Sequence, residues 1–460
     1  MPTCDVVVGI DLGTTNSAVA VIDRGLPKIV TIDDGNRTMP SVVHYGKEGT
    51  VSVGRAAQQK QMHDPENVIH SAKRFMGRSS EDTAEDAKNV AFKTTADEED
   101  FSMIFAPALG ETLYPEEVAG EILRKILRDA EAELNEEITK AVIAVPAYFD
   151  DMQREATEIA GRAAGLDKVK LLREPQAAAL AYGVRKEEDA TILVFDLGGG
   201  TFDVSILEVG GGAIEVLSTG GDAHLGGNDF DSVVMEWILE EAGKSRANAT
   251  VDTGNTDVMN TLTAASRALR ERISEKGQAT LRLPMFGADF KVTLTRNNLE
   301  CLSADLLRRM RLPVEHAALQ AGVDLDAHRK IDTQRDGRKK GKAAISRRRR
   351  PGAGCWMRCC WWGRHAHACC AALVENMTGL SPRLSAVDPD EAVALGAAVQ
   401  AGVLEGTMGG LAVMDVWQAS LMRAVAANQL KEMERAGVDG DTEGLFGETE
   451  NGNNESDECA

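Results

Sequence analysis

One short pattern occurs twice in this chain, about 185 positions apart, and it constrains the fold more than any other feature. In residues 6–17 and again in residues 192–203, an apolar run ends in an aspartate, a turn rich in Gly or Thr follows, and a second apolar run begins. Two apolar runs joined by a glycine-containing turn are typical of a β-hairpin. The repetition therefore predicts two units of similar architecture.

The stretches around these hairpins alternate between helix and strand patterns. Residues 116–134 and 152–164 have helical periodicity, whereas residues 140–145 are a continuous apolar run typical of a buried strand. Such alternation indicates α/β layers. Between residues 222 and 313, two helical pieces precede two strand patterns, which predicts a subdomain inserted in the second unit. These segments are 230–242, 258–274, 279–283 and 290–294.

Composition indicates a folded, soluble protein with an acidic surface. The 460 residues are enough for about three domains, and 43% apolar with 27% charged residues is ordinary for a globular chain. A balance of 51 basic against 72 acidic residues gives a net charge of −21. Nucleic acids and anionic membranes attract the opposite charge, so neither is an expected partner. A monomer is the simplest expectation.

Cysteine usage and the N-terminus bear on the compartment. Five of the eight cysteines lie between residues 355 and 370, which leaves too few for a disulfide framework elsewhere and indicates a reducing compartment. The first residues carry no basic leader pattern, and no run of about 18 apolar residues occurs. The cytoplasm is the first expectation; a plastid or another organelle is the alternative if a transit peptide precedes this sequence.

The two hairpins carry residues suited to phosphate chemistry. Glycine turns let several backbone N–H groups approach one anion. Asp11, Asp196 and Asp203 could hold the hydrated Mg²⁺ that accompanies a nucleotide, because a hard cation prefers carboxylate and water oxygens. A single hairpin of this kind is more often purely structural. Two copies with Thr in the turns favour a ligand.

Eight segments, taken in order, resemble the ATPase domain of the 70-kDa heat-shock chaperones of the DnaK type. They are GIDLGTTNS (9–17), RTMPS (37–41), AKRFMGR (72–78), VIAVPAYF (142–149), REPQAAALAYG (173–183), FDLGGGTFD (195–203), LGGNDFD (225–231) and VDPDEAVALGAA (387–398). The resemblance implies an actin-like ATPase fold, in which two lobes with duplicated ribonuclease-H-like cores enclose a nucleotide cleft. It places lobe I at 1–185 and lobe II at 186–405.

The same resemblance assigns site residues. It implies ATP or ADP with Mg²⁺, and K⁺ as a further ion. Mg²⁺ would be held, mostly through water, by Asp11, Glu174, Asp196 and Asp203. The implied catalytic residues are these four with Lys73 and Thr201, where Lys73 would orient the attacking water. The implied nucleotide-binding residues are Gly13, Thr14, Thr15, Asn16, Gly198, Gly199, Gly200, Thr201, Gly226, Gly227, Arg270, Ser274 and Asp390.

Two further assignments depend on family position alone. Pro146 and Arg154 resemble the switch between nucleotide state and substrate-domain state, although each would otherwise be an ordinary strand-end proline and a surface arginine. Arg267 stands where the family usually has Glu. Contacts to the purine are therefore a weaker expectation than contacts to the phosphates.

The resemblance stops at about residue 332 and resumes at about residue 372. Residues 335–350 carry nine bases and one acid, and a stretch rich in Cys, His and Trp follows at 355–370. A nuclear-localisation or nucleic-acid patch and a zinc module are two interpretations. Adjacent cysteine pairs do not have the spacing of a structural zinc site.

A third interpretation comes from the genetic code. Shifting the frame between residues 354 and 363 gives a nearly forced Leu-Leu-Val-Gly, which is similar to a family strand that leads into an adenosine loop. Retained intron sequence with frame shifts over 332–372 is the preferred hypothesis, with a genuine insertion or a functional basic or metal element as alternatives. If the chain is made as written, a Cys/Trp/Arg-rich stretch must lie where that strand was.

The C-terminal part adds little chemistry. Residues 409–416 resemble the apolar interdomain linker within a segment at 406–436, residues 417–433 could form one helix, and residues 437–460 hold eight acids and no base, which predicts a disordered tail. No segment matches a substrate-binding domain, so the interpretation is a DnaK-type ATPase truncated after its ATPase domain.

The expected function is slow ATP hydrolysis driving a chaperone cycle. The resemblance implies a J-domain cochaperone and a nucleotide-exchange factor as partners, and client polypeptides only if the true product has a substrate domain. One alternative is a catalytically weak module that binds cochaperones without folding clients. A more distant one is an actin-like or sugar-kinase-like enzyme on the same fold.

Overall fold

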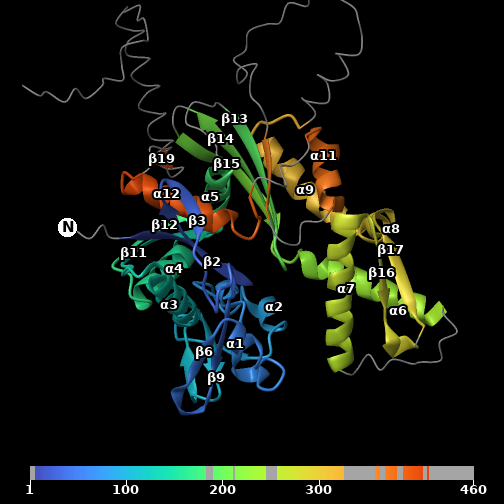
Figure 1. Ribbon diagram of the computed structural model, residues 1–460, viewed down its shortest axis with the longest axis horizontal. Helices are drawn as coiled ribbons and strands as arrows, with labels where there is room; N and C mark the ends of the chain where they lie inside the picture. The colour runs from blue at the N-terminus through green and yellow to red at the C-terminus, as the bar shows by residue number, and fades with distance from the viewer. Residues whose placement is uncertain are drawn as a thin grey trace, which may run out of the picture. The chain divides into compact units, whose positions relative to one another are not determined.

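The first unit of the fold is a sheet built around the first hairpin (Figure 1). The computed structural model describes residues 6–182, 190–210, 213–244, 256–287, 289–325, 358–362, 368–380, 387–407 and 412–413. The sheet has the order β12 (Lys168–Arg173), β11 (Lys140–Val145), β1 (Val7–Asp11), β2 (Asn16–Asp23) and β3 (Leu26–Ile29). β1 pairs in parallel with β11 and antiparallel with β2, and β4 (Met39–Pro40) also pairs with β2.

The second sheet repeats the arrangement of four of these strands, β11-β1-β2-β3, around the second hairpin. Its order is β18 (Arg358–Trp362), β13 (Ala190–Leu197), β14 (Phe202–Gly210), β15 (Ala213–Asp222) and β19 (Ala412–Val413). β13 pairs in parallel with β18 and antiparallel with β14, as β1 does with β11 and β2. The predicted repetition is thus present in the topology as well as in the sequence.

β18 comes from the stretch rich in Cys and Trp. Its backbone runs in register with β13 from Ile192 opposite Arg358 to Asp196 opposite Trp362. A Cys/Trp-rich segment therefore does pair as the strand beside β13. The basic run at 335–350, the predicted helix at 417–433 and the predicted tail at 437–460 lie outside the described residues.

Helices on the first sheet include one from far along the chain. α3 (Pro115–Leu134) and α4 (Asp151–Ala163) pack together, and Asp150 begins α4 by accepting a hydrogen bond from Gln153 N at 2.9 Å. α12 (Ala392–Leu404) packs on β1, β2 and β11 and crosses α5 (Glu174–Ala181). Assigning residues 186–405 as one lobe was therefore wrong for α12.

The reason α12 fits the first sheet is its small residues. Ala394 and Ala398 are buried against Ala18 and Ala20 of β2. Gly9 of β1 lies so close to this helix that a Cβ there would stand 2.0 Å from Ala398 N. Small side chains on both surfaces let the backbones approach.

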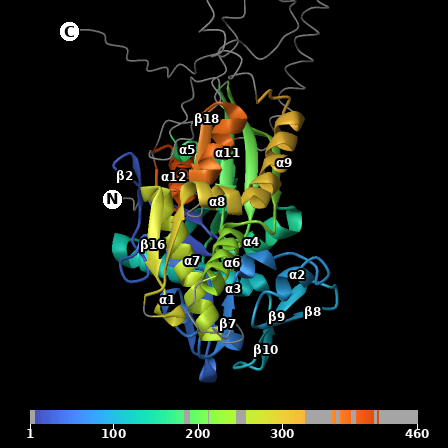
Figure 2. The same cartoon turned by 90° about the vertical axis from the view of Figure 1, so that its right-hand side faces the viewer.

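The inserted subdomain has its own apolar core. It comprises α6 (Gly227–Lys244), α7 (Thr256–Lys276), β16 (Gln278–Arg282), β17 (Lys291–Thr295) and α8 (Arg296–Leu302). The predicted boundary at 313 was wrong, because Pro313 lies inside α9 (Ala304–Gln320). Met310 and Val314 of α9 pack in the core of the second sheet, so this helix belongs there. Figure 2 shows α9 beside α11 (Ala368–Thr378).

Two small sheets extend from the first unit. One has the order β6 (Val51–Val53), β5 (Val42–Tyr45) and β7 (Val68–His70), with α1 (Arg55–Gln58) beside it. The other has the order β10 (Glu111–Leu113), β9 (Ser102–Ala106) and β8 (Lys93–Ala96), and α2 (Ala84–Ala87) precedes β8. No helix among the described residues is long and apolar enough to span a membrane.

Thiol reactivity tests the placement of α11. Cys369 is 2% exposed in an apolar cluster, and burial raises the pKa of its thiol to about 12, whereas Cys301 of α8 is exposed. Because the thiolate is the reactive species, we expect iodoacetamide at pH 8 to modify Cys369 more than about 100-fold more slowly than Cys301. Peptide mass spectrometry reads each site separately. Equal labelling of the two would mean that α11 does not pack here.

Candidate functional site

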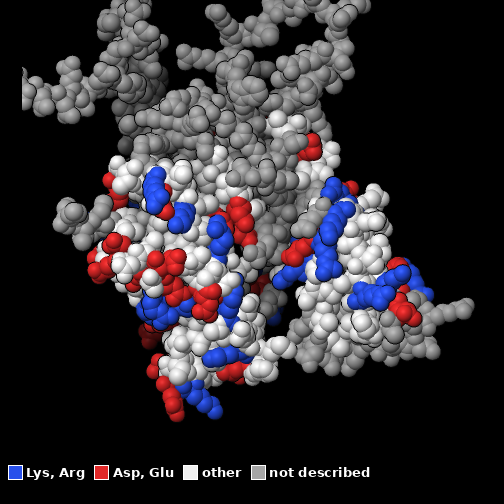
Figure 3. Space-filling view, viewed as in Figure 1, with Lys and Arg blue, Asp and Glu red and all other residues white. Residues whose placement is uncertain are grey.

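A cleft of about 670 Å³ gathers residues from both hairpins. Its walls are the end of β1 with the turn after it, the turn between β13 and β14, the 3-10 turn Ala72–Arg74 and the start of α5. Among the residues drawn in colour on the face shown in Figure 3, acidic and basic side chains are interspersed.

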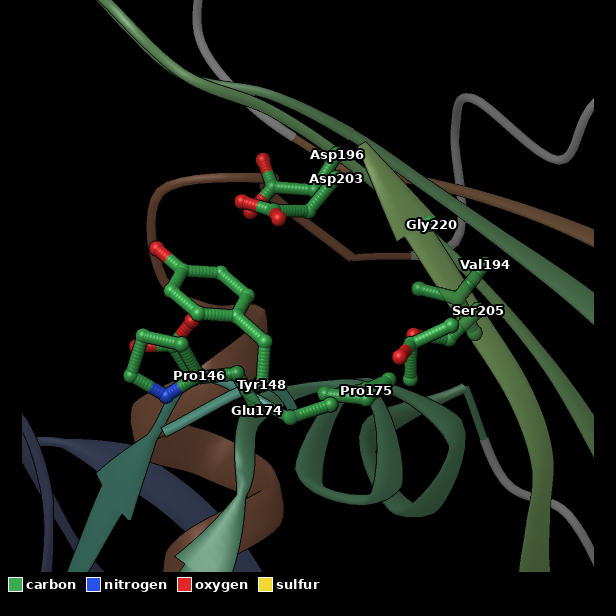
Figure 4. Close-up of a pocket in the computed structure, with 11 residues that line it drawn as sticks. Pro146, Tyr148, Glu174, Pro175, Val194, Asp196, Asp203, Ser205 and Gly220 are labelled. Carbon is green, nitrogen blue, oxygen red and sulfur yellow. The ribbon is translucent and has the colours of Figure 1, made fainter. Parts of the chain in front are cut away.

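Four carboxylates meet in this cleft. Asp11 ends β1, and Glu174 begins α5, which follows β12 directly. Asp196 of β13 and Asp203 of β14 are cross-strand partners, and in Figure 4 their side chains point together into the pocket above Tyr148. Cross-strand partners lie about 5 Å apart, so the hairpin itself brings these two acids together.

The carboxylates repel one another in a poorly solvated place. Burial, and then the charge of Glu174, raise the pKa of Asp11 to about 7 and that of Asp203 to about 8. Burial and the charge of Asp203 hold the pKa of Asp196 well above its ordinary value. The folded chain is therefore stabilised by any positive charge placed among these groups.

Lys73 supplies one such charge. Its Nζ lies 2.7 Å from Glu174 Oε1 and 5.7 Å from the centre of the Phe149 ring, and its side chain is only 8% exposed. A lysine side chain held in this way has little conformational freedom, so its ammonium group stays in the cleft rather than in bulk water.

The donor set fits a hydrated hard cation better than a directly bound one. Among the described residues, no three His, Cys, Asp or Glu side chains stand close enough to hold a metal ion directly. The acids nevertheless raise one another's pKa values, so they are close enough to interact electrostatically. Mg²⁺ usually keeps several waters and needs only one or two carboxylates, and these residues suit that mode.

The two turns are shaped by close backbone contacts. A Cβ at Gly13 would stand 2.0 Å from Asn16 O, so only glycine fits. In the second turn, Gly198 N donates to Thr201 O at 2.9 Å. The start of α6 then fastens this turn, because Gly227 N donates to Gly198 O at 2.9 Å and Asn228 N donates to Gly199 O at 2.8 Å.

Comparison with known proteins gives the family. A family model described as Hsp70 protein matches residues 7–332 and 369–437. The chain belongs to the Hsp70 family. Members of this family are ATPases with an actin-like fold, and the mixed α/β architecture agrees with that fold. The internal gap in the Hsp70 match, residues 333–368, lies inside the segment 332–372 where the resemblance fails.

Similar curated proteins are Hsp70 chaperones of plants and algae. Heat shock 70 kDa protein 7, chloroplastic, of Arabidopsis thaliana is 42% identical over 90% of this chain and 54% of its own length. The stromal 70 kDa heat shock-related protein, chloroplastic, of Pisum sativum is 41% identical over 90% and 55%. Chaperone protein dnaK of Thalassiosira pseudonana is 40% identical over 90% and 65%. The chain thus spans about half the length of the two plant relatives.

Most of the Hsp70-derived site residues line the cleft. They are Asp11, Gly13, Thr14, Thr15, Asn16, Lys73, Pro146, Glu174, Asp196, Gly198, Gly199, Gly200, Thr201, Asp203 and Asp390. Next to Asp390, Glu391 accepts hydrogen bonds from Arg37 of the RTMPS segment at both carboxylate oxygens. The roles assigned to these residues stay predictions.

Other predicted residues are not among those lining the cleft. Arg270 is 1% exposed, with its Nε 2.7 Å from Asp231 Oδ1, and Ser274 donates to Arg270 O at 3.2 Å. Gly226 instead packs against the second turn, where a Cβ would stand 2.4 Å from Gly200 N. Arg154 lies in α4. Arg270 and Ser274 are thus placed to support the inserted subdomain, and their purine contacts stay a prediction.

Several residues that line the cleft were not among the site residues predicted from the sequence. Arg74 and Asp86 line the cleft as an ion pair with a 2.6 Å contact, and Tyr148 and Asn228 line it as well. Arg74, Tyr148 and Asn228 lie inside the matched segments 72–78, 142–149 and 225–231. A fuller use of those segments could have named these three.

Proposed function

We propose that this chain binds Mg²⁺ with ATP or ADP and hydrolyses ATP slowly, as the ATPase part of a DnaK-type chaperone. The observation that carries the proposal is the meeting of both aspartate-bearing hairpins with the Lys73–Glu174 pair at one cleft. In this proposal the two sheets are ribonuclease-H-like cores of two lobes that enclose the nucleotide.

The chemistry follows from positions and charges. Backbone N–H groups of Thr14, Thr15 and the turn 198–201 bind the phosphates. A bound Mg²⁺ would supply charge neutralisation at the phosphates and would release the carboxylates from their mutual repulsion. Lys73 orients the attacking water and balances the charge on the terminal phosphate, and Glu174 keeps that ammonium group in place at 2.7 Å.

Coupling to other proteins is part of the proposal. Membership of the family supports a J-domain protein and a nucleotide-exchange factor as partners, and client polypeptides are substrates only if the full product has a substrate-binding domain. β19, from the segment 409–416 that resembles a linker, pairs in parallel with Ala213 and Ile214 of β15. If the linker pairs with this sheet, a change in the sheet on nucleotide binding would be transmitted to the segment that follows the linker. The names of the two plant relatives favour a plastid over the cytoplasm.

Phosphate release from ATP tests the proposal. We expect slow turnover that requires Mg²⁺ and that rises when a J-domain protein is added, because the cochaperone acts on the hydrolysis step. The measurement is single-turnover hydrolysis with matched reactions containing EDTA. Equal rates of ATP hydrolysis with and without Mg²⁺ would contradict the proposed ATPase function. Binding of ATP without any hydrolysis would contradict it as well.

A non-enzymatic module that binds cochaperones is the second candidate. The observation that favours it is the interruption of the family match at 333–368, where the resemblance places an adenosine loop. This candidate predicts a stable complex with a J-domain protein but no nucleotide-dependent change in that complex. Stimulated ATP turnover would eliminate it.

A further inference from the structure

Two arginines from different elements approach the second turn of the cleft, Arg74 directly and Arg267 through Asn228. Arg74 belongs to the 3-10 turn Ala72–Arg74, and its guanidinium lies so close to Gly200 that a Cβ there would be 2.6 Å from Nη2. Arg267 belongs to α7, and its Nη2 lies 3.3 Å from Asn228 Oδ1. Asn228 is itself fastened to the turn, since its backbone N donates to Gly199 O at 2.8 Å.

Each arginine is anchored in the same way. Asp86 accepts from Arg74 Nη1 at 2.6 Å and from Arg78 Nη1 at 3.2 Å. On the other side, Asp231 accepts from Arg267 Nε at 3.0 Å and from Arg270 Nε at 2.7 Å. Both aspartates are buried, with 5% and 2% of their side chains exposed.

Each aspartate is shared between two arginines, so neither Arg74 nor Arg267 has its aspartate to itself. Arg74 and Arg267, which are 22% and 45% exposed, line the cleft, whereas Arg78 and Arg270 are not among its lining residues. A buried carboxylate also fixes the orientation of each guanidinium in advance, which reduces the entropy lost on binding an anion.

We propose that Arg74 and Arg267, which line the cleft from two different elements near the turn 198–201, form a clamp for the phosphate tail of the nucleotide. The proposal rests on the proposed function, because the tail belongs to the nucleotide, and it deepens that function by naming two further binding residues. Guanidinium groups bind phosphate oxygens through paired, charge-assisted hydrogen bonds, and a phosphate chain between the two arginines removes their mutual repulsion. Arg267 stands where the family usually has Glu, so this half of the clamp is a property of this chain.

The variants Arg74→Ala and Arg267→Ala test the clamp without exposing a buried charge. Asp86 keeps Arg78 and Asp231 keeps Arg270 in these variants, so we expect both proteins to fold. Arg272→Ala is the matched control, because Arg272 is an exposed arginine on the same helix as Arg267. Circular dichroism checks the fold of every variant.

Calorimetry measures the affinity of each variant for three probes in the presence of Mg²⁺. The probes are adenosine, ADP and tripolyphosphate. Because each variant loses a charge-assisted hydrogen bond to a phosphate oxygen, it should bind ADP and tripolyphosphate roughly 10-fold or more weakly than the wild type. Adenosine binding should change by less than about 2-fold, and Arg272→Ala should match the wild type for all three probes.

The outcomes separate the clamp from the function. Wild-type affinity for ADP in both clamp variants, or equal losses for ADP and adenosine, would overturn the clamp while the proposed function stands. Arginine-dependent binding of tripolyphosphate by a protein that does not bind ADP would support the clamp and overturn the nucleotide function. If the wild type binds neither ADP nor tripolyphosphate, both proposals are wrong.

Discussion

Replacing Lys73 with alanine should lower ATP turnover by more than about 100-fold and leave the fold intact. Removing one preorganised charge or donor from a water-excluded site typically costs 10²–10³ in rate. Lys73 has this setting, because it is 8% exposed and lies 2.7 Å from Glu174 among three further carboxylates. The measurement is single-turnover hydrolysis, with ADP affinity measured in parallel so that chemistry is separated from binding.

Two companion variants sharpen this test. Lys28→Ala is the control, since Lys28 is 66% exposed and pairs with exposed Asp23 at 3.2 Å, a type of pair that is worth little. Asp11→Asn should also cost more than about 100-fold in turnover. Because burial already raises the pKa of Asp11 to about 7, removal of its charge should change stability by less than about 1 kcal/mol. Turnover like that of the wild type in both site variants would remove Lys73 and Asp11 from the mechanism.

The local parts of the site could be predicted because they are encoded in short stretches. An apolar run, an aspartate and a glycine turn specify a hairpin with an acid at its end, and the two copies of this pattern identify Asp11 and Asp196 from sequence alone. The helix at 115–134 and the strand at 140–145 were likewise predicted within one or two residues from periodicity.

Long-range packing could not be predicted from such local patterns. In the sequence, α12 is one more helix after the second unit, yet it lies on the first sheet, because its alanines and glycine match small residues on β1, β2 and α5. The predicted end of the inserted subdomain at 313 falls inside α9. α9 continues past it, since Val314 and Ala317 on the same helix are buried against the second sheet. The pairing of arginines with Asp86 and Asp231 depends on contacts between residues 8 to 39 positions apart, which no local pattern shows.

Gly396→Ala should destabilise the protein by more than about 3 kcal/mol, although alanine is the better helix former by about 1 kcal/mol. A Cβ at this position in α12 would stand 1.8 Å from Ala177 O and 2.4 Å from Ala177 C in α5. Both atoms are backbone, so no side chain can rotate away and the two helices must separate. Separation also moves Glu174 at the start of α5, which pairs with Lys73.

The matched control is Gly243→Ala in α6, where nothing lies within 4 Å of an added Cβ. There the same change removes only the flexibility of glycine and should raise stability by up to about 1 kcal/mol. Thermal unfolding of the two variants beside the wild type gives the comparison, with ATP turnover as the second readout for Gly396→Ala. We expect a lower unfolding temperature and weaker turnover in that variant alone. An unchanged unfolding temperature for Gly396→Ala would mean that α12 and α5 do not cross at these residues.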